Sequence, residues 1–93
     1  MRTIWKFTLA TRNEAGIFKV PEGAHFFYAG QDPSGELCAW AYVNTAEPEV
    51  HRRIAVVGTG QPFPFESGAD FLGTVVEGPY VWHIFAEMEA YHV

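Results

Sequence analysis

The most chemically suggestive part of this chain is a glycine-rich turn that follows a strand-like segment. Residues 51–57 alternate polar and apolar side chains, as a β-strand does, and a Gly-Thr-Gly sequence at residues 58–60 follows at once. A strand that ends in such a bend exposes backbone N–H groups, which can bind an anion such as a phosphate. Arg52 and Arg53 lie one strand-length upstream and could add positive charge. The pattern predicts either an anion site or an ordinary tight turn whose glycines supply positive φ.

This glycine turn does not match the known nucleotide-binding loops. It lacks the Gly-Lys-Ser/Thr ending of a phosphate-binding loop, and no helical pattern follows it, as a dinucleotide fingerprint requires. Neighbouring residues on a strand point to opposite faces, so only one of Arg52 and Arg53 can face a given pocket. We expect the other arginine to pair with an acid such as Glu47 or Glu49.

Side chains near the end of the chain could complete such a site. Tyr80 or Trp82 could stack on a nucleobase, and Gln61 or His83 could bind the polar edge of the base. Packing in the core is the alternative for the tryptophans, and it is the stronger one for Trp40. The predicted ligand-binding residues are Arg52, Arg53, Gly58, Thr59, Gly60, Gln61, Tyr80, Trp82 and His83.

No motif for catalysis, for a metal or for a cofactor accompanies these residues. The four histidines lack the i, i+2 or i, i+4 spacing of paired metal ligands. The single cysteine, Cys38, lies within an apolar segment, which is a poor setting for a reactive thiol. We therefore expect a non-catalytic protein that uses no metal and no cofactor, although a catalytic site assembled from distant residues stays open.

Length and composition limit the protein class. A chain of 93 residues is one domain, residues 1–93, and buries roughly 60–65 % of the surface that its unfolded form exposes. The net charge of −5 opposes binding to duplex nucleic acid. One cysteine cannot form an intramolecular disulfide, which fits the cytoplasm. The amino terminus alternates instead of forming an apolar run, so we expect no signal peptide and no membrane segment.

The dominant hydrophobic period is two, which is typical of β-strands. Turn signals every 8–12 residues predict a single all-β domain, a small sandwich or a partly open barrel of about seven short strands. Residues 37–43 are apolar on both faces and predict a central strand covered on both sides. Residues 13–16 predict a turn, and residues 61–69 an irregular segment with room for one helical turn. Residues 31–36 predict a hairpin turn, and residues 77–79 a tight connection between two strands. The last residues, 86–93, predict a short helix or a frayed tail. The expected strands are residues 3–9, 17–20, 24–30, 37–43, 51–57, 71–76 and 80–85.

Taken together, these segments resemble a family of small, mostly uncharacterised bacteriophage proteins. The resemblance is carried by Thr-Ile-Trp-Lys-Phe at residues 3–7, Leu-Cys-Ala-Trp-Ala-Tyr-Val at 37–43, Gly-Thr-Gly-Gln-Pro at 58–62 and Val-Trp-His-Ile-Phe at 81–85. It covers nearly the whole chain. The family pattern often has His where this chain has Gln61, and it usually ends soon after the position of residue 85. The resemblance thus implies that residues 86–93 are an addition.

A phage setting suggests one function, namely the sequestration of a nucleotide signal that bacterial immunity uses. We expect a non-catalytic protein that binds a small anionic, nucleotide-like ligand as a homo-oligomer. The alternative is a protein-interaction module that docks on a host or phage protein through an exposed strand edge or an aromatic patch. An enzyme that degrades such a signal is a third, weaker possibility.

Overall fold

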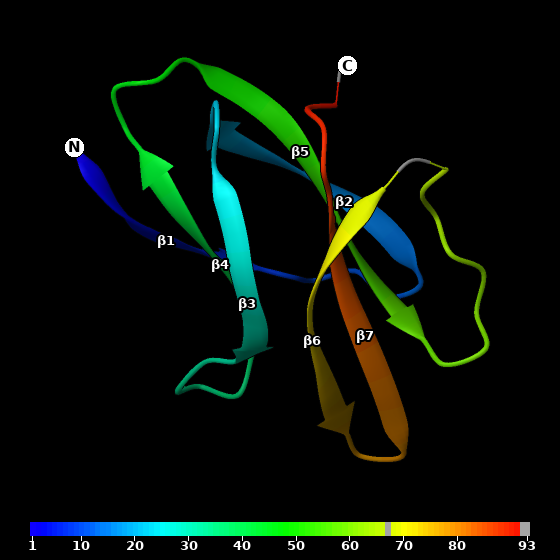
Figure 1. Ribbon diagram of the computed structural model, residues 1–93. Helices are drawn as coiled ribbons and strands as arrows, with labels where there is room; N and C mark the ends of the chain where they lie inside the picture. Colours follow the sequence, from blue (N-terminus) through cyan, green and yellow to red (C-terminus); the bar gives the residue numbers. More distant parts are fainter. Residues whose placement is uncertain (67, 92–93) are drawn as a thin grey trace.

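A computed structural model describes residues 1–66 and 68–91 of the chain, and Figure 1 shows its two antiparallel sheets. The predicted all-β class is confirmed, since the described residues form seven strands and no helix. The sheets make a small sandwich and no closed barrel. The strands are β1 (Arg2–Thr8), β2 (Glu14–Pro21), β3 (His25–Gln31), β4 (Leu37–Asn44), β5 (Glu49–Gly58), β6 (Ala69–Glu77) and β7 (Tyr80–Glu87).

The two sheets divide the strands unevenly. One has the order β1-β4-β3, and the other has the order β2-β5-β7-β6. Two connections between neighbouring strands are tight hairpins: residues 32–36 join β3 to β4, and Gly78, with a φ of 59°, helps to join β6 to β7. The turn chemistry read from Asp-Pro-Ser-Gly and Glu-Gly-Pro therefore predicts the hairpins correctly.

The core lies between the inner faces of the two sheets. Strand alternation places Ala39, Ala41 and Val43 of β4 inward, opposite Ile54 and Val56 of β5, and all five side chains are buried. A smaller cluster lies on the outer face of the four-stranded sheet, where Phe65 of the 59–68 connection covers Ala55 and Val57. Buried aromatic side chains thus lie in two places. Phe26 and Trp82 lie between the two sheets, and Phe65 lies on the outer face of the four-stranded sheet.

Glycine at position 73 allows the two sheets to approach each other at one edge, where β3 contacts β6. A Cβ atom at Gly73 would lie 2.5 Å from the carbonyl oxygen of Ala29 in β3. Non-bonded carbon and oxygen atoms do not come this close, so only glycine fits between these backbones without a shift. The register of β6 against β7 also shifts between Phe71 and Gly73.

Three local expectations are wrong. Residues 14–16 are not part of a turn, because β2 begins at Glu14 and pairs with Val56 of β5. The described residues of the 61–69 segment are irregular as far as residue 68, as predicted, but contain no helical turn, and residues 86–91 form no helix. Instead, β7 extends to Glu87, and Tyr91 forms a bridge with His51 of β5. Residues 92 and 93 of the expected helix lie outside the described residues. Cross-strand pairing outweighs the high intrinsic helix propensity of the Ala, Glu and Met residues here, because tertiary contacts override local propensity.

The strand at residues 37–43 is central, as predicted, but it is not covered on both sides. Its outward side chains include Tyr42, which is 47 % exposed, and Trp40, which is half-buried. An apolar outer face predicts burial, but the structure leaves Tyr42 and part of Trp40 open to solvent. In the part of the chain that is described, no helix is long and apolar enough to span a bilayer.

Candidate functional site

The glycine turn is a hydrogen-bonded reverse turn. The N–H of Gln61 donates to the carbonyl of Gly58 at 3.0 Å, and Gly60 has a φ of 87°, as the third position of a type II turn requires. The N–H of Gly58 donates to the Asn13 side chain at 2.9 Å. Among the described residues, the N–H groups of Thr59 and Gly60 have no acceptor. The anion nest expected from the sequence is therefore reduced to two backbone donors and the Thr59 hydroxyl.

A pocket of 280 Å³ lies beside this turn, and we call it the turn pocket. It forms where the end of β5 meets the beginning of β7, since Gly58 pairs with Trp82 across the two strands. Five of the nine predicted ligand-binding residues are brought together here. The lining residues are Asn13, Gly58, Thr59, Gln61, Pro79, Tyr80, Val81 and Trp82.

Two stacked aromatic rings form one wall of the turn pocket. The centroids of Tyr80 and Trp82 are 5.6 Å apart, with 22° between the ring planes. Trp82 is only 7 % exposed, belongs to the main core, and donates its indole N–H to Glu77 at 3.0 Å. Tyr80 is 59 % exposed. The ring available to a ligand is thus Tyr80, and Trp82 supports it from behind.

His83 points away from the core, on the face of β7 opposite to Trp82, and contacts two threonine hydroxyls. Its Nε2 lies 2.8 Å from the Oγ1 of Thr59, and its Nδ1 lies 3.1 Å from the Oγ1 of Thr74 in β6. A hydroxyl beside an imidazole resembles a nucleophile with its base. However, Thr74 is neutral and cannot stabilise an imidazolium as a carboxylate does. The arrangement is better suited to fixing the Thr59 side chain at the rim of the turn pocket.

Arg53 lies far from the glycine turn and is engaged elsewhere. Its guanidinium forms a two-pronged pair with the Glu87 carboxylate, with Nε 3.0 Å from Oε1 and Nη2 bonded to Oε2. It also stacks between the rings of Phe65 and Tyr91, at 5.2 and 4.4 Å from their centroids. The Glu87 hydrogen bond raises the pKa of Arg53. The expected pairing with Glu47 or Glu49 is therefore wrong.

Arg52 points to the opposite face, as strand alternation predicts, and is 8 % exposed. It donates to the backbone carbonyls of Glu87 and Ala24, and its guanidinium lies 5.4 Å from the centroid of the Phe26 ring. Burial lowers the pKa of Arg52, and Asp70 and Glu87 partly offset that effect.

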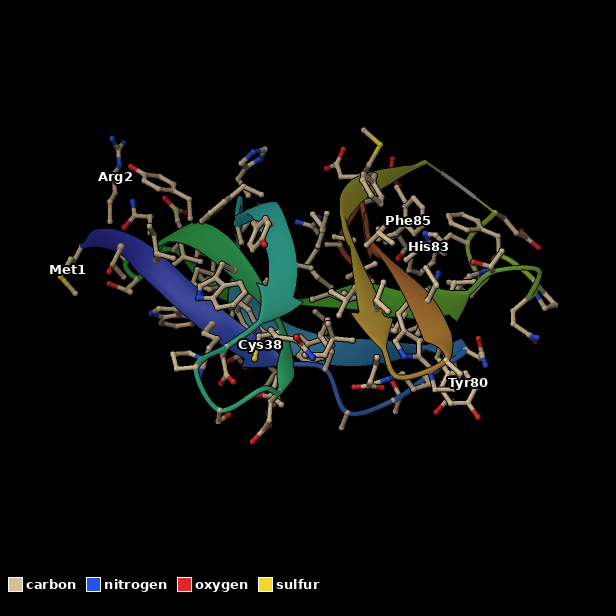
Figure 2. The ribbon with its side chains drawn as sticks, turned by 90° about the horizontal axis from the view of Figure 1, so that it is seen from below. Met1, Arg2, Cys38, Tyr80, His83 and Phe85 are labelled. Atoms are coloured by element: carbon tan, nitrogen blue, oxygen red, sulfur yellow. The ribbon has the colours of Figure 1, made fainter. Side chains whose placement is uncertain are left out.

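Neither arginine reaches the glycine turn. Arg52 precedes Gly58 by six residues, or about 20 Å along an extended strand. Figure 2 shows His83 and Tyr80 toward the β6–β7 end of the molecule. Sequence proximity suggested a joint site because residues 51–60 form one segment. The extension of β5 separates its two ends.

The cation nearest the turn pocket is Arg12, which the sequence analysis did not select. Its guanidinium lies 5.5 Å from the centroid of the Trp82 ring and 3.3 Å from an oxygen of Glu77, and it donates to the carbonyl of Leu9 at 2.8 Å. The described residues that line the pocket carry no charge, and the charge of the neighbouring Arg12 is balanced by Glu77.

Asn13 is the other residue that sequence reasoning missed. It has a φ of 58°, in the left-handed region that asparagine tolerates best after glycine, and its side chain caps the glycine turn. The signal was present, because an Asn in a turn often bonds to a backbone group. Its partner, Gly58, is distant in sequence and could not be foreseen. The described residues contain no group of three or more metal-ligating side chains.

Comparison with known proteins identifies the family but not an activity. A domain family of unknown function, DUF7352, matches residues 1–92, and the chain belongs to this family. No curated protein and no solved structure matches the chain. Because the match continues to residue 92, the segment after residue 85 belongs to the family domain, and the prediction that it is an addition is wrong.

Proposed function

We propose that this protein binds a small ligand with a flat ring, a nucleotide or nucleoside, in the turn pocket without transforming it. One observation carries the proposal: Gly58, Thr59, Gln61 and Tyr80, chosen from the sequence for ligand binding, line one pocket together with Asn13. Ligand sites typically combine apolar walls with a few convergent polar groups, and this lining has that composition.

Each part of the lining has a distinct role in this proposal. The exposed ring of Tyr80 stacks on the ligand ring, an interaction worth about 1–3 kcal/mol for a nucleobase. The amide groups of Asn13 and Gln61 bind its polar edge. The N–H groups of Thr59 and Gly60, with the Thr59 hydroxyl, hold a phosphate or a ribose hydroxyl. Of the residues that the structure describes, none with a charged side chain lines the pocket, so these backbone and hydroxyl donors alone would hold the phosphate.

The pocket volume restricts the size of the ligand. At 280 Å³, the turn pocket is slightly smaller than the roughly 300–1,000 Å³ of most small-molecule sites. It accommodates one ring system with its sugar. A cyclic di- or trinucleotide would need the turn pockets of two protomers. Binding of such a ligand therefore requires a homo-oligomer.

The biological role proposed for this binding is the sequestration of a nucleotide immune signal in the cytoplasm. It rests on the resemblance to small phage proteins, because phage-encoded binding proteins can act by removing such a signal. Sequestration requires only binding, which agrees with a site that has neutral polar groups and no acid–base pair.

Calorimetric titration of the purified protein tests the proposal, with adenosine, AMP, GMP, cyclic mono-, di- and trinucleotides and ADP-ribose as ligands. We expect heat with at least one of them, the ligand recovered intact, and a loss of about tenfold or more in affinity for Tyr80→Ala. Tyr42→Ala is the matched control, since it removes a similarly exposed tyrosine from the other sheet. Absence of binding across the panel, or equal loss in both variants, contradicts the proposal, and a cleaved ligand indicates an enzyme.

A protein-interaction module is the second candidate, and the free edge of β1 favours it. Within residues 1–66 and 68–91, this strand pairs only with β4, its register is regular from Arg2 to Thr8, and Ile4 is 56 % exposed. Such an edge can accept a strand from a partner. A stoichiometric protein captured from host lysate, retained by Tyr80→Ala and lost with Ile4→Lys, would favour this function over ligand binding.

A further inference from the structure

The outer face of the β1-β4-β3 sheet carries a row of open aromatic side chains. Across the strands, Tyr28 of β3 pairs with Trp40 of β4, and the next outward residue of β4 is Tyr42. Tyr28 is 55 % exposed, Tyr42 is 47 % exposed and Trp40 is half-buried. In the part of the chain that the structure describes, no other element covers these rings. We call Tyr28, Trp40 and Tyr42 the aromatic platform.

The ring of Tyr28 lies close to the sheet surface. A Cβ atom built on Gly30 would be only 2.8 to 3.1 Å from the hydroxyl and ring atoms of Tyr28, so the Tyr28 ring occupies the space that a side chain would fill. Its centroid is 5.8 Å from that of Trp40, with 34° between the planes. Rings that lie flat along a sheet present their faces to solvent, where a planar group can stack.

Charge on this sheet differs from that of the whole chain. The net charge is −5, yet the sequences of β1, β3 and β4 contain no aspartate or glutamate. Arg2 and Lys6 point to the outer face with the platform, because they pair with Asn44 and Trp40. His25, which pairs with Tyr42, is on the same face.

One of these cations is already paired. Asp32 lies in the hairpin after β3, bonds to Lys6 at 2.8 Å, and also accepts the N–H of Ser34 and of Glu36 at 3.0 Å. The charge of Lys6 is therefore balanced, and Arg2 supplies the positive charge beside the platform. Figure 2 shows Arg2 and Tyr80 at opposite ends of the molecule.

We propose that the aromatic platform binds single-stranded nucleic acid by stacking bases on Tyr28, Trp40 and Tyr42, with Arg2 on a phosphate. Stacking on flat side chains beside a basic border is how proteins bind single strands without sequence preference. A duplex keeps its bases stacked on each other and offers no free faces, so it gains nothing from the platform. This site is separate from the turn pocket and does not depend on its ligand.

Fluorescence anisotropy with labelled oligothymidylate and oligouridylate at low salt tests the proposal. We expect binding of the single strands, and a fall in affinity of about tenfold for Tyr28→Ala and for Tyr42→Ala. Tyr28→Phe keeps the ring and should bind as the wild type does. Phe71→Ala removes a similarly exposed aromatic ring from the other sheet, outside the turn pocket, and is the matched control.

Salt dependence separates this site from an uncharged one. Each phosphate contact on a single strand contributes a slope of about −0.7 in log K against log salt, so Arg2 predicts a slope of about −0.7. Arg2→Gln should remove most of this slope. The proposal is overturned if single strands fail to bind, if duplex DNA binds equally well, if Phe71→Ala weakens binding as much as Tyr28→Ala, or if binding is independent of salt. Sedimentation that shows a dimer formed through the platform, which Tyr28→Ala dissociates, would also overturn it.

Discussion

Replacing Gly73 with alanine should be among the most damaging small changes to this protein. The new methyl group would lie 2.5 Å from the carbonyl oxygen of Ala29, on the strand β3 that faces β6. A backbone oxygen cannot rotate away as a side chain can, so the two sheets must separate locally. Overpacking typically costs 1–3 kcal/mol, and we expect the upper end, about 3 kcal/mol, because both contacting groups belong to strands.

Gly68→Ala is a matched control for this prediction. Its Cβ would lie 2.8 Å from the sulfur atom of Met88, which is the far end of a flexible side chain that is 57 % exposed. Both changes restrict the unfolded chain by a similar amount, so that contribution cancels in the comparison. The difference in free energy of unfolding between the two variants therefore measures how much more a contact with rigid backbone costs than a contact with a flexible side chain.

Urea denaturation followed by tryptophan fluorescence measures both variants. For Gly73→Ala we expect a lower midpoint with an unchanged m-value, and a melting temperature lower by about 12 °C or more at roughly 4–8 °C per kcal/mol. Gly68→Ala should stay within about 0.5 kcal/mol of the wild type. If the two variants have equal stability, the sheets do not meet at Gly73 as described.

Three further predictions concern charged and reactive groups. Glu87→Gln should lower the free energy of unfolding by about 2 kcal/mol in urea denaturation, less than the 3–5 of a fully buried pair because Arg53 is 27 % exposed; an unchanged midpoint would contradict the pairing. Hydrogen bonds from Lys6 and Ser34 hold the pKa of Asp32 well below its usual value, so its stabilising effect is complete above about pH 4 and is lost as the pH falls toward that lowered pKa. The stability difference between wild type and Asp32→Asn should therefore shrink in acid, and a difference that does not change with pH would refute this. Burial raises the pKa of Cys38, so a thiol reagent should modify it only as the protein unfolds, and rapid labelling of the native protein would count against the burial.

Some residues of the turn pocket could be predicted because they lie at strand ends, and strand ends are set by local sequence. A strand must end where Gly-Thr-Gly begins, and Tyr80 must follow the turn at Gly78 and Pro79, so these residues were found at strand ends. The meeting of these two strand ends in one pocket depends on the pairing of Gly58 with Trp82. Asn13 was missed for the same reason, since its hydrogen bond to Gly58 spans 45 residues.

The sequence by itself determined the all-β class, six of the seven strands closely, the tight turns at residues 32–36 and 78–79, and the opposite orientations of Arg52 and Arg53. These follow from local rules: side chains alternate along a strand, and glycine, proline and aspartate favour turns. The tertiary structure alone decided which strands are neighbours, and so which faces are open. An apolar outer face at Trp40 and Tyr42 looks the same in sequence whether it is covered or not. The same holds for Arg53, whose partner Glu87 is brought to it only by the pairing of β5 with β7.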